Sequence, residues 1–175
     1  GNGPLDMRMD DRLGVTAAQL LGALGEKQLS ELFQVYGGEE AHRAIAKAIV
    51  TERKRKPIQT TEQLAKLVSK IKRKKGKLHP ATKVFQALRI VVNDELTNIE
   101  QALPQALKLI SNGVIVTIAF HEGEDRLAKH FFKEAEQSGL GKASDLVKPG
   151  EDELKTNQRA RSAKLRAFYS KAKNQ

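Results

Sequence analysis

The sequence predicts an α/β protein that is mostly helical and that contains only part of a β-sheet. Apolar residues recur at helical spacing through the first 75 residues. One β-branched, nearly continuous apolar run, VIVTIAF at 114–120, is typical of an interior strand covered on both faces. Only 164–169 offers a second convincing strand, and a sheet of two strands is marginal. We therefore expect another chain, or sequence outside these 175 residues, to supply the rest of the sheet.

The first part of the chain is expected to be entirely helical. Thr16 is a good N-cap for a short helix that ends near Gly25. Thr60 and Gln63 have the spacing of a capping box, which begins an amphipathic helix with a basic end. In the helix expected at 39–54, acids come first and bases last, as the helix dipole favours. The four predicted helices cover residues 17–25, 28–36, 39–54 and 61–75.

The second part is expected to mix helices with the two strands. Pro80 suits the first turn of a long helical region. A further helix at 98–109 would start near a Thr97/Asn98 cap, with Pro104 bending or dividing it. Residues 124–137 return to the helical period, and 142–157 resembles a loop.

Basic residues are concentrated in two zones. Residues 51–77 have a net charge of +9 and residues 155–175 of +7, although the whole chain carries only +10. The remaining residues are therefore acidic overall, with a net charge of −6. Two basic zones on an acidic body favour a polyanionic partner such as nucleic acid, because cations that neutralise phosphates release counterions. The alternative is a solvated helix face and a basic tail.

The composition excludes several kinds of site. Without Cys there is no disulfide framework, thiolate metal site or Cys nucleophile, which fits a reducing cytoplasm. No apolar run approaches the roughly 18 to 20 residues that span a bilayer, so we expect no membrane partner. We expect a bacterial cytoplasm, with an organelle as the alternative.

Five sequence blocks, taken in order, resemble one family. That family is the S-adenosylmethionine-dependent methyltransferases of the MraW/RsmH type, which modify cytosine N4 in small-subunit ribosomal RNA. The resemblance covers essentially the whole chain with matching spacing. The blocks are GPLDMRMD at 3–10, YGGEEAHRAIAKAIV at 36–50, HPATKVFQALRIVVNDEL at 79–96, FHEGEDRLAKHFF at 120–132 and NQRARSAKLR at 157–166.

The resemblance implies an architecture that explains the missing strands. Such enzymes have a Rossmann-like methyltransferase domain interrupted by a helical substrate-recognition domain. Residues 1–10 would be the domain junction, 11–82 the inserted helical domain and 83–175 the C-terminal half of the methyltransferase domain. Residues 114–120 would then join the sheet, and 163–169 would be an edge strand.

The resemblance also implies S-adenosylmethionine as cofactor and small-subunit ribosomal RNA or a 30S-type subunit as partner. The glycine-rich turn that would hold the cofactor lies in the missing N-terminal half, so we expect no cofactor-binding residue in this chain and no activity from it alone. The chain departs from the family after Phe120, where Glu122 and Gly123 replace the usual Ser-Leu. This departure affects the end of a central strand, where α/β sites are built.

Three residues are candidates for the target-base pocket: Asp6, His121 and Asp125. An N4 amine must be extracted, held in line and relieved of a proton, so acceptors are needed around it. The alternative for Asp6, with Asp10, is pairing with Arg8 at the junction. The alternative for His121 is capping the following helix. A metal role is not expected, because His121, Glu122 and Asp125 have no further convergent ligand in the sequence.

The candidate RNA contacts are basic or amide side chains from the junction, the basic zones and one predicted helix. We expect them to contact mainly phosphates, because no aromatic residues are interleaved with them. They are Arg8, Arg53, Lys54, Arg55, Lys56, Lys72, Arg73, Lys74, Lys75, Arg89, Asn93, Arg159, Arg161 and Arg166.

We therefore expect this chain to be the C-terminal portion of a ribosomal RNA cytosine-N4 methyltransferase, including its helical insert. A non-catalytic RNA-binding or assembly module derived from that fold is the alternative from another class. An upstream strand with a Gly-rich turn would favour the enzyme, and a start codon near residue 1 would favour the module. A homodimer that exchanges strands to complete a sheet is a third possibility.

Overall fold

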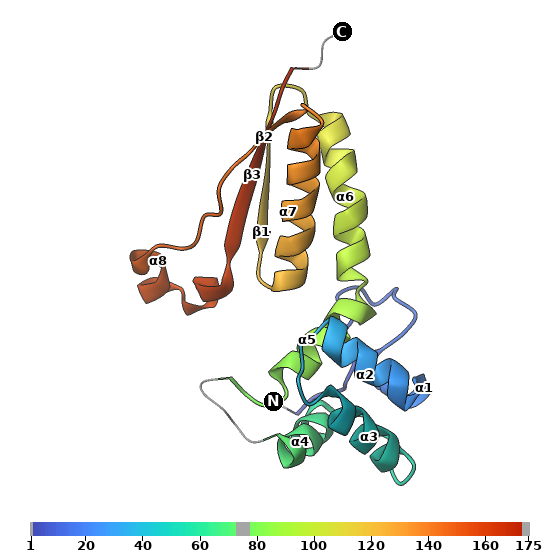
Figure 1. The fold of residues 1–175 in the computed structure, drawn as a ribbon. Helices are drawn as coiled ribbons and strands as arrows, with labels where there is room; N and C mark the ends of the chain where they lie inside the picture. The colour runs from blue at the N-terminus through green and yellow to red at the C-terminus, as the bar shows by residue number, and fades with distance from the viewer. Residues whose placement is uncertain (1, 73–77, 173–175) are drawn as a thin grey trace. The chain divides into compact units, whose positions relative to one another are not determined.

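The computed structural model describes residues 2–72 and 78–172. The chain divides into two compact units, Gly1–Asp94 and Glu95–Gln175, which Figure 1 shows as a helical unit and an α/β unit. In the described part of the chain, no helix is both long enough and apolar enough to cross a membrane.

From residue 17 onwards, the regular elements of the described first unit are helices, as predicted, whereas residues 2–16 contain no helix and pair with Thr60 through Pro4. Its core is formed by apolar side chains from all the helices and from Leu5 of the N-terminal segment, including Phe33, Ile49 and Leu88, each buried completely or nearly so. The helices are α1 (Ala17–Ala23), α2 (Glu26–Val35), α3 (His42–Arg53), α4 (Thr61–Ile71) and α5 (Thr82–Val92).

Both predicted N-terminal caps are confirmed. The Thr16 side chain accepts a hydrogen bond from the backbone N–H of Gln19, and the Gln19 side chain accepts one from Thr16 N, which closes a capping box on α1. Thr60 and Gln63 form the same box on α4. Helix α4 is described to Ile71, and the remainder of its predicted basic end, residues 73–75, lies outside the described residues.

The predicted start of the third helix at residue 39 is wrong. Helix α3 begins at His42, and Glu39 precedes it with a fully buried side chain. The Glu39 carboxylate accepts hydrogen bonds from Lys72 Nζ at 2.7 and 2.9 Å and from the backbone N–H of Ala41 at 3.1 Å. Glu39 therefore neutralises Lys72. It does not lie in the first turn of α3, where it would interact with the helix dipole.

The second unit is built on a three-stranded sheet with the order β1-β3-β2, in which both pairs are antiparallel. Helix α7 packs on this sheet and α6 packs on α7, as Figure 1 shows. The rings of Phe132 in α7 and Phe168 in β3 stack with centroids 5.5 Å apart, at the centre of the core. The elements are α6 (Glu95–Leu109), β1 (Val114–Ala119), α7 (Glu122–Gln137), β2 (Gly141–Ala143), α8 (Glu151–Thr156), a 3-10 turn (Gln158–Ser162) and β3 (Lys164–Ser170).

Several expected boundaries in this unit are corrected. Helix α6 starts at Glu95, so Thr97/Asn98 is not its cap, and Pro104 lies inside the helix. The early start follows from Asp94, whose φ of 49° ends α5 and redirects the chain. The stretch expected to be a loop contains part of β2 and all of α8. The strand expected at 164–169 is confirmed as β3, but it lies between β1 and β2 and not at an edge.

The strand at 114–119 is confirmed, and its expected interior position, which depends on strands outside this chain, stays a prediction. Ile115 and Ala119 point into the core, but Val114, Val116 and Ile118 are 49%, 55% and 57% exposed. Strand β1 is also at an edge of the sheet. The apolar pattern of β1 predicts that both of its faces are covered. Among the described residues, only the face with Ile115 and Ala119 is covered.

Candidate functional site

The junction segment holds an ion pair that fixes the position of Asp6. Arg8 Nε donates to Asp6 Oδ1 at 2.7 Å and a second guanidinium nitrogen donates to Oδ2 at 2.9 Å, a bidentate geometry. The same guanidinium donates to the carbonyls of Asp11 and Leu13. Hydrogen bonding to Arg8 lowers the pKa of the Asp6 carboxyl. Asp10 pairs with Arg12, not with Arg8, so the alternative given for Asp6 and Asp10 holds for Asp6 alone.

Asn93 binds this segment and holds an unusual backbone conformation. Met7 has φ of 68°, in the left-handed region that non-glycine residues rarely adopt. The Asn93 side chain accepts from Met9 N at 2.7 Å and donates to the carbonyl of Met7 at 2.9 Å and that of Arg89 at 2.8 Å. Sequence reasoning placed Asn93 among the RNA contacts. The left-handed conformation had no sequence signal, because position 7 is not Gly.

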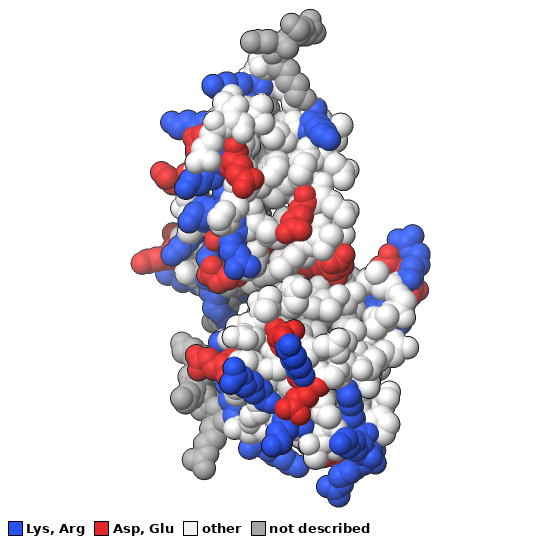
Figure 2. Space-filling model, turned by 45° about the vertical axis from the view of Figure 1, so that its right-hand side comes forward, with Lys and Arg blue, Asp and Glu red and all other residues white. Residues whose placement is uncertain are grey.

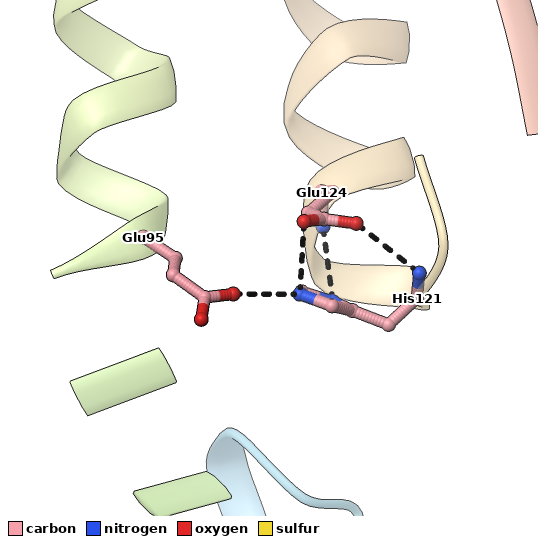
Figure 3. A group of neighbouring side chains, drawn as sticks. All are labelled: Glu95, His121 and Glu124. Carbon is pink, nitrogen blue, oxygen red and sulfur yellow. Dashed lines mark hydrogen bonds and ion pairs between the residues drawn. The ribbon is translucent and has the colours of Figure 1, made fainter. Parts of the chain in front are cut away.

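Two carboxylates surround His121, and sequence reasoning missed both of them. Figure 3 shows Glu95 at the start of α6 and Glu124 in the first turn of α7 facing the His121 ring. His121 Nε2 lies 3.4 Å from Glu124 Oε1 and 3.7 Å from Glu95 Oε2, and this nitrogen is buried. The absence of a convergent ligand set was the reason given against a metal, and that reason is wrong, since these three side chains converge.

The hydrogen bonds of His121 nevertheless argue against a cation at Nε2. Its Nδ1 accepts from the backbone N–H groups of Gly123 at 3.1 Å and Glu124 at 3.3 Å, so Nδ1 carries the lone pair. In the neutral ring the proton is then on Nε2, which leaves no lone pair there for a metal. Glu124 Oε2 accepts from Phe120 N and His121 N, which completes a capping box on α7. The ring is thus a helix cap with an Nε2–H between two carboxylates.

Asp125, the third predicted pocket residue, belongs to a network of charges at the start of β3. Arg166 donates to its two oxygens at 2.7 and 3.3 Å, and Lys164 Nζ lies 3.4 Å from Oδ2. Lys164 also pairs with Glu122. Hydrogen bonding to Arg166 is the largest cause of the lowered pKa of Asp125, and burial opposes it. Asp125 is therefore an ionised and weakly basic acceptor.

The structure separates the predicted RNA contacts into two groups. The first group is bonded within the protein. Arg53 donates to the carbonyls of Leu21 and Leu24 at the end of α1. Lys72 pairs with Glu39, Arg8 with Asp6 and Arg166 with Asp125. Others have exposed side chains, namely Lys54, Arg55, Lys56, Arg159 and Arg161. Arg89 is half-buried, and Arg73, Lys74 and Lys75 lie outside the described residues.

The exposed cations do not form one continuous surface in the view of Figure 2. Lys and Arg side chains are interspersed with Asp and Glu on this face of each unit. In the first unit the exposed run at 54–56 follows α3, next to a cavity of about 180 Å³ that Lys56, Lys66 and Lys70 help to line. This run is the densest group of predicted phosphate contacts with exposed side chains.

The chain matches a known protein family over nearly its whole length. The MraW methylase family matches residues 1–171. A protein of Acidobacterium capsulatum named ribosomal RNA small subunit methyltransferase H is 48% identical over an alignment that covers 97% of this chain and 58% of the relative. A protein of the same name from Coprothermobacter proteolyticus is 46% identical over 95% of this chain and 56% of its own length.

These matches also show how much of each relative's length the chain covers. The share of the relative that is covered ranges from 52% for the protein of Beijerinckia indica to 62% for that of Methylococcus capsulatus. The chain thus spans about half the length of the curated relatives it matches. The match over residues 1–171 and the identities of 40–48% give one conclusion: this chain belongs to the MraW methylase family.

Proposed function

We propose that this chain is part of a small-subunit ribosomal RNA methyltransferase that transfers a methyl group from S-adenosylmethionine to the N4 amine of a cytosine. The observation that carries the proposal is the family match over residues 1–171, together with relatives named ribosomal RNA small subunit methyltransferase H. The partner would be small-subunit ribosomal RNA or a 30S-type subunit. The location would be a bacterial cytoplasm, or else an organelle.

The exposed face of β1 supports a role as part of a larger fold. Val114, Val116 and Ile118 form an apolar row on an edge strand, which is costly to leave in water. Further strands and helices would cover it in a Rossmann-like domain. In this proposal residues 1–10 are the junction, 11–82 the inserted helical domain and 83–175 the C-terminal half of the methyltransferase domain.

The described residues do not fit the cofactor by themselves. A Rossmann-like cofactor site needs a glycine-rich turn between a strand and a helix. Gly37 lies between helices, where a Cβ would meet the Lys83 carbonyl at 2.5 Å, and a Cβ on Gly141 would meet the Tyr169 carbonyl at 2.2 Å. These glycines allow the protein to pack on itself. We therefore propose that the cofactor is held by another part of the enzyme and that this chain alone is inactive.

Methylation of an exocyclic amine removes a proton from it, so the pocket must offer an acceptor. Asp6, His121 and Asp125 remain our proposed pocket residues. Asp6 is fixed by Arg8 on one wall of a cavity of about 550 Å³, which favours it as the acceptor with access to a ligand. His121 and Asp125 are engaged in a helix cap and an ion pair, so we propose that they position the strand end.

We propose that the exposed cations Lys54, Arg55, Lys56, Arg159 and Arg161 contact RNA phosphates directly. Arg8, Arg53, Lys72 and Arg166 would contribute by holding the backbone of the binding surface, because each is bonded within the protein. Arg89 remains a proposed contact on α5, as do Arg73, Lys74 and Lys75 in the segment outside the described residues. Asn93, which is buried and bonded to the backbone of Met7 and Met9, would contribute by holding that backbone.

Isothermal titration calorimetry with S-adenosylmethionine tests the first part of the proposal. We expect no binding by this chain at micromolar concentrations, and micromolar affinity would contradict the assignment of the cofactor to another part of the enzyme. Adding the N-terminal portion of the Acidobacterium capsulatum relative, up to the matched segment, should restore labelled methyl transfer to small-subunit ribosomal RNA.

The rival function is a non-catalytic RNA-binding or assembly module. It predicts that this chain binds RNA. It also predicts no methyl transfer when the N-terminal portion of the relative is added and the two portions associate. Sedimentation of the mixture checks that association. Sedimentation of the chain alone tests the proposed strand-exchanged homodimer, which a monomer at all concentrations would exclude.

A further inference from the structure

A cavity of about 180 Å³ lies between the end of α3 and one face of α4, within the first unit. Three lysines line it, namely Lys56 from the connection after α3, and Lys66 and Lys70 from α4. Ile58, which is 5% exposed, and Leu67 form the apolar part of the lining. The cavity therefore combines three cations with a small apolar surface.

The cations of this cavity are available to an external anion. Among residues 2–72 and 78–172, Lys56 and Lys70 form no ion pair. Lys66 pairs with Glu62 at 2.6 Å, but both side chains are exposed, and surface pairs of this kind contribute little to stability. A phosphate group can therefore compete with Glu62 for Lys66.

Gln63 adds a hydrogen-bond donor that the start of α4 holds in place. Its Oε1 accepts from the backbone N–H groups of Gln59 at 2.7 Å and Thr60 at 3.0 Å, which leaves the amide nitrogen as a donor. Gln63 also lines the cavity, three residues before Lys66 and seven before Lys70. Residues at these spacings share one face of a helix, so α4 presents three donors together.

Glu52 is the one acidic side chain among the described residues that line the cavity. It is half-buried in the last turn of α3, and within the described part of the chain its carboxylate forms no hydrogen bond or ion pair. Its backbone carbonyl accepts from Arg55 N at 2.9 Å and Lys56 N at 3.0 Å, which holds this turn together. A carboxylate beside a phosphate site can accept from a hydroxyl group, and the ribose 2′-hydroxyl is the one that lies next to an RNA phosphate.

We propose that this cavity binds the backbone of one RNA nucleotide and that Glu52 distinguishes ribose from deoxyribose. The phosphate would contact Lys56, Lys66 and Lys70 and accept from the Gln63 amide. The 2′-hydroxyl would donate to Glu52, because this group is what allows a protein to tell RNA from DNA. The site would read the sugar and no base. The inference rests on the proposed function, since it assumes that the chain binds RNA.

Three labelled decanucleotides with the same base test the sugar contact by fluorescence anisotropy at low salt. They are decauridylate, its 2′-deoxy form and its 2′-fluoro form, which keeps the ribose pucker but has no hydroxyl proton. We expect the unaltered chain to bind decauridylate at least about five-fold more tightly than either of the others. Glu52→Ala should reduce this preference to less than about two-fold, because only the ribose loses a partner. Loss of a negative charge by itself would change all three affinities equally.

The double replacement of Lys66 and Lys70 with Gln tests the phosphate contacts. It should weaken binding of decauridylate at least about five-fold and reduce the magnitude of the slope of log K against log salt by about 1.4. Replacing Lys27 and Lys47 with Gln is the matched control, because both are exposed and neither lines the cavity. Lys27 also pairs with Glu31 four residues on, as Lys66 pairs with Glu62 four residues back. The control should leave the slope unchanged, and circular dichroism checks that all variants fold.

Three results would each overturn the inference: equal affinity for the three oligonucleotides, a ribose preference that persists in Glu52→Ala, or equal slopes in the two lysine variants. A 2′-fluoro form that binds as tightly as decauridylate would assign the preference to sugar pucker and also overturn it. If RNA binding then still fell with Lys54 and Arg55 neutralised, the proposed RNA contacts would stand without this cavity. Failure to bind any RNA would contradict both, whereas methyl transfer with the relative's N-terminal portion tests the enzyme separately.

Discussion

At the scale of single residues, the junction depends on an amide that supports a left-handed backbone. For a residue with a Cβ, that conformation costs about 1 to 2 kcal/mol. Asn93 offsets the cost by bonding to Met7 O and Met9 N on either side of Arg8. Asp6 and Arg8 are thereby presented together at one cavity.

We expect Asn93→Ala to destabilise the chain by about 1 to 3 kcal/mol, because its buried side chain makes three backbone hydrogen bonds. The loss should be smaller in a Met7→Gly background, since glycine adopts positive φ without a steric cost. Urea denaturation of the four proteins measures this coupling. Strictly additive effects would show that Asn93 does not act through the Met7 backbone.

Asp125 gives a residue-scale prediction that depends on pH. Its pKa lies below the ordinary value of 3.8, so its ionised form is favoured in the folded state. The pairing therefore stabilises the protein fully above about pH 4 and is lost as the pH falls through the folded pKa. At pH 7, Asp125→Asn should destabilise by about 2 to 4 kcal/mol, because Arg166 and Lys164 lose their shared carboxylate.

The difference in unfolding free energy between the Asp125→Asn variant and the parent should shrink below pH 4. Urea denaturation from pH 7 to pH 3 measures it. Asp152→Asn is the control, because Asp152 pairs with Lys155 through a side chain that is 98% exposed. A pH-independent difference for Asp125→Asn would show that packing, not charge, is the cause of the loss.

At the scale of elements, β2 pairs with β3 at a position that only glycine fits. A Cβ on Gly141 would lie 2.2 Å from the Tyr169 carbonyl and 2.7 Å from the Phe168 ring, and neither can yield without moving the strand or the core. Strand β2 has three residues and pairs with β3 from Gly141↔Ser170 to Ala143↔Phe168. A change at Gly141 therefore affects the whole pairing.

Gly141→Ala should destabilise the second unit by at least about 2 kcal/mol, as overpacking against backbone does. Gly150→Ala is the matched control: no atom lies within 4 Å of its Cβ position, and its φ is −74°. Thermal unfolding followed by circular dichroism compares the two. Equal midpoints would contradict the close approach of β2 to β3.

At the scale of the whole molecule, charge is distributed so that only some cations are exposed to a polyanion. Exposed Lys54, Arg55 and Lys56 are adjacent, whereas Arg53 before them is bonded to the end of α1. RNA affinity should therefore depend on this run and on ionic strength.

The slope of log K against log salt is negative for RNA binding. Replacing Lys54, Arg55 and Lys56 with Gln should reduce its magnitude by about 2, if each contacts a phosphate of single-stranded RNA. Fluorescence anisotropy between 50 and 200 mM salt measures the slope. A triple replacement of the exposed Arg126, Lys129 and Lys133 on α7 removes the same charge elsewhere. Equal slopes in the two variants would show that binding follows net charge alone.

Local chemistry allowed much of the fold to be predicted. Capping residues at Thr16 and Thr60 and the helical periods identified helices α1 to α7, because these signals act within one or two turns. Helix α8 was missed. The apolar runs identified β1 and β3 for the same reason. Strand β2 was missed because three residues pair only through a distant partner, β3.

The sequence by itself determined the family blocks, helices α1 to α7, the two longer strands and the two basic zones, since each is a property of neighbouring residues. The tertiary structure decided which charges are used internally. Glu95 meets His121, Glu39 meets Lys72, and Asn93 meets the Met7 backbone, although the partners in each pair are more than 20 positions apart. Such contacts form only when elements pack, so no local pattern can specify them.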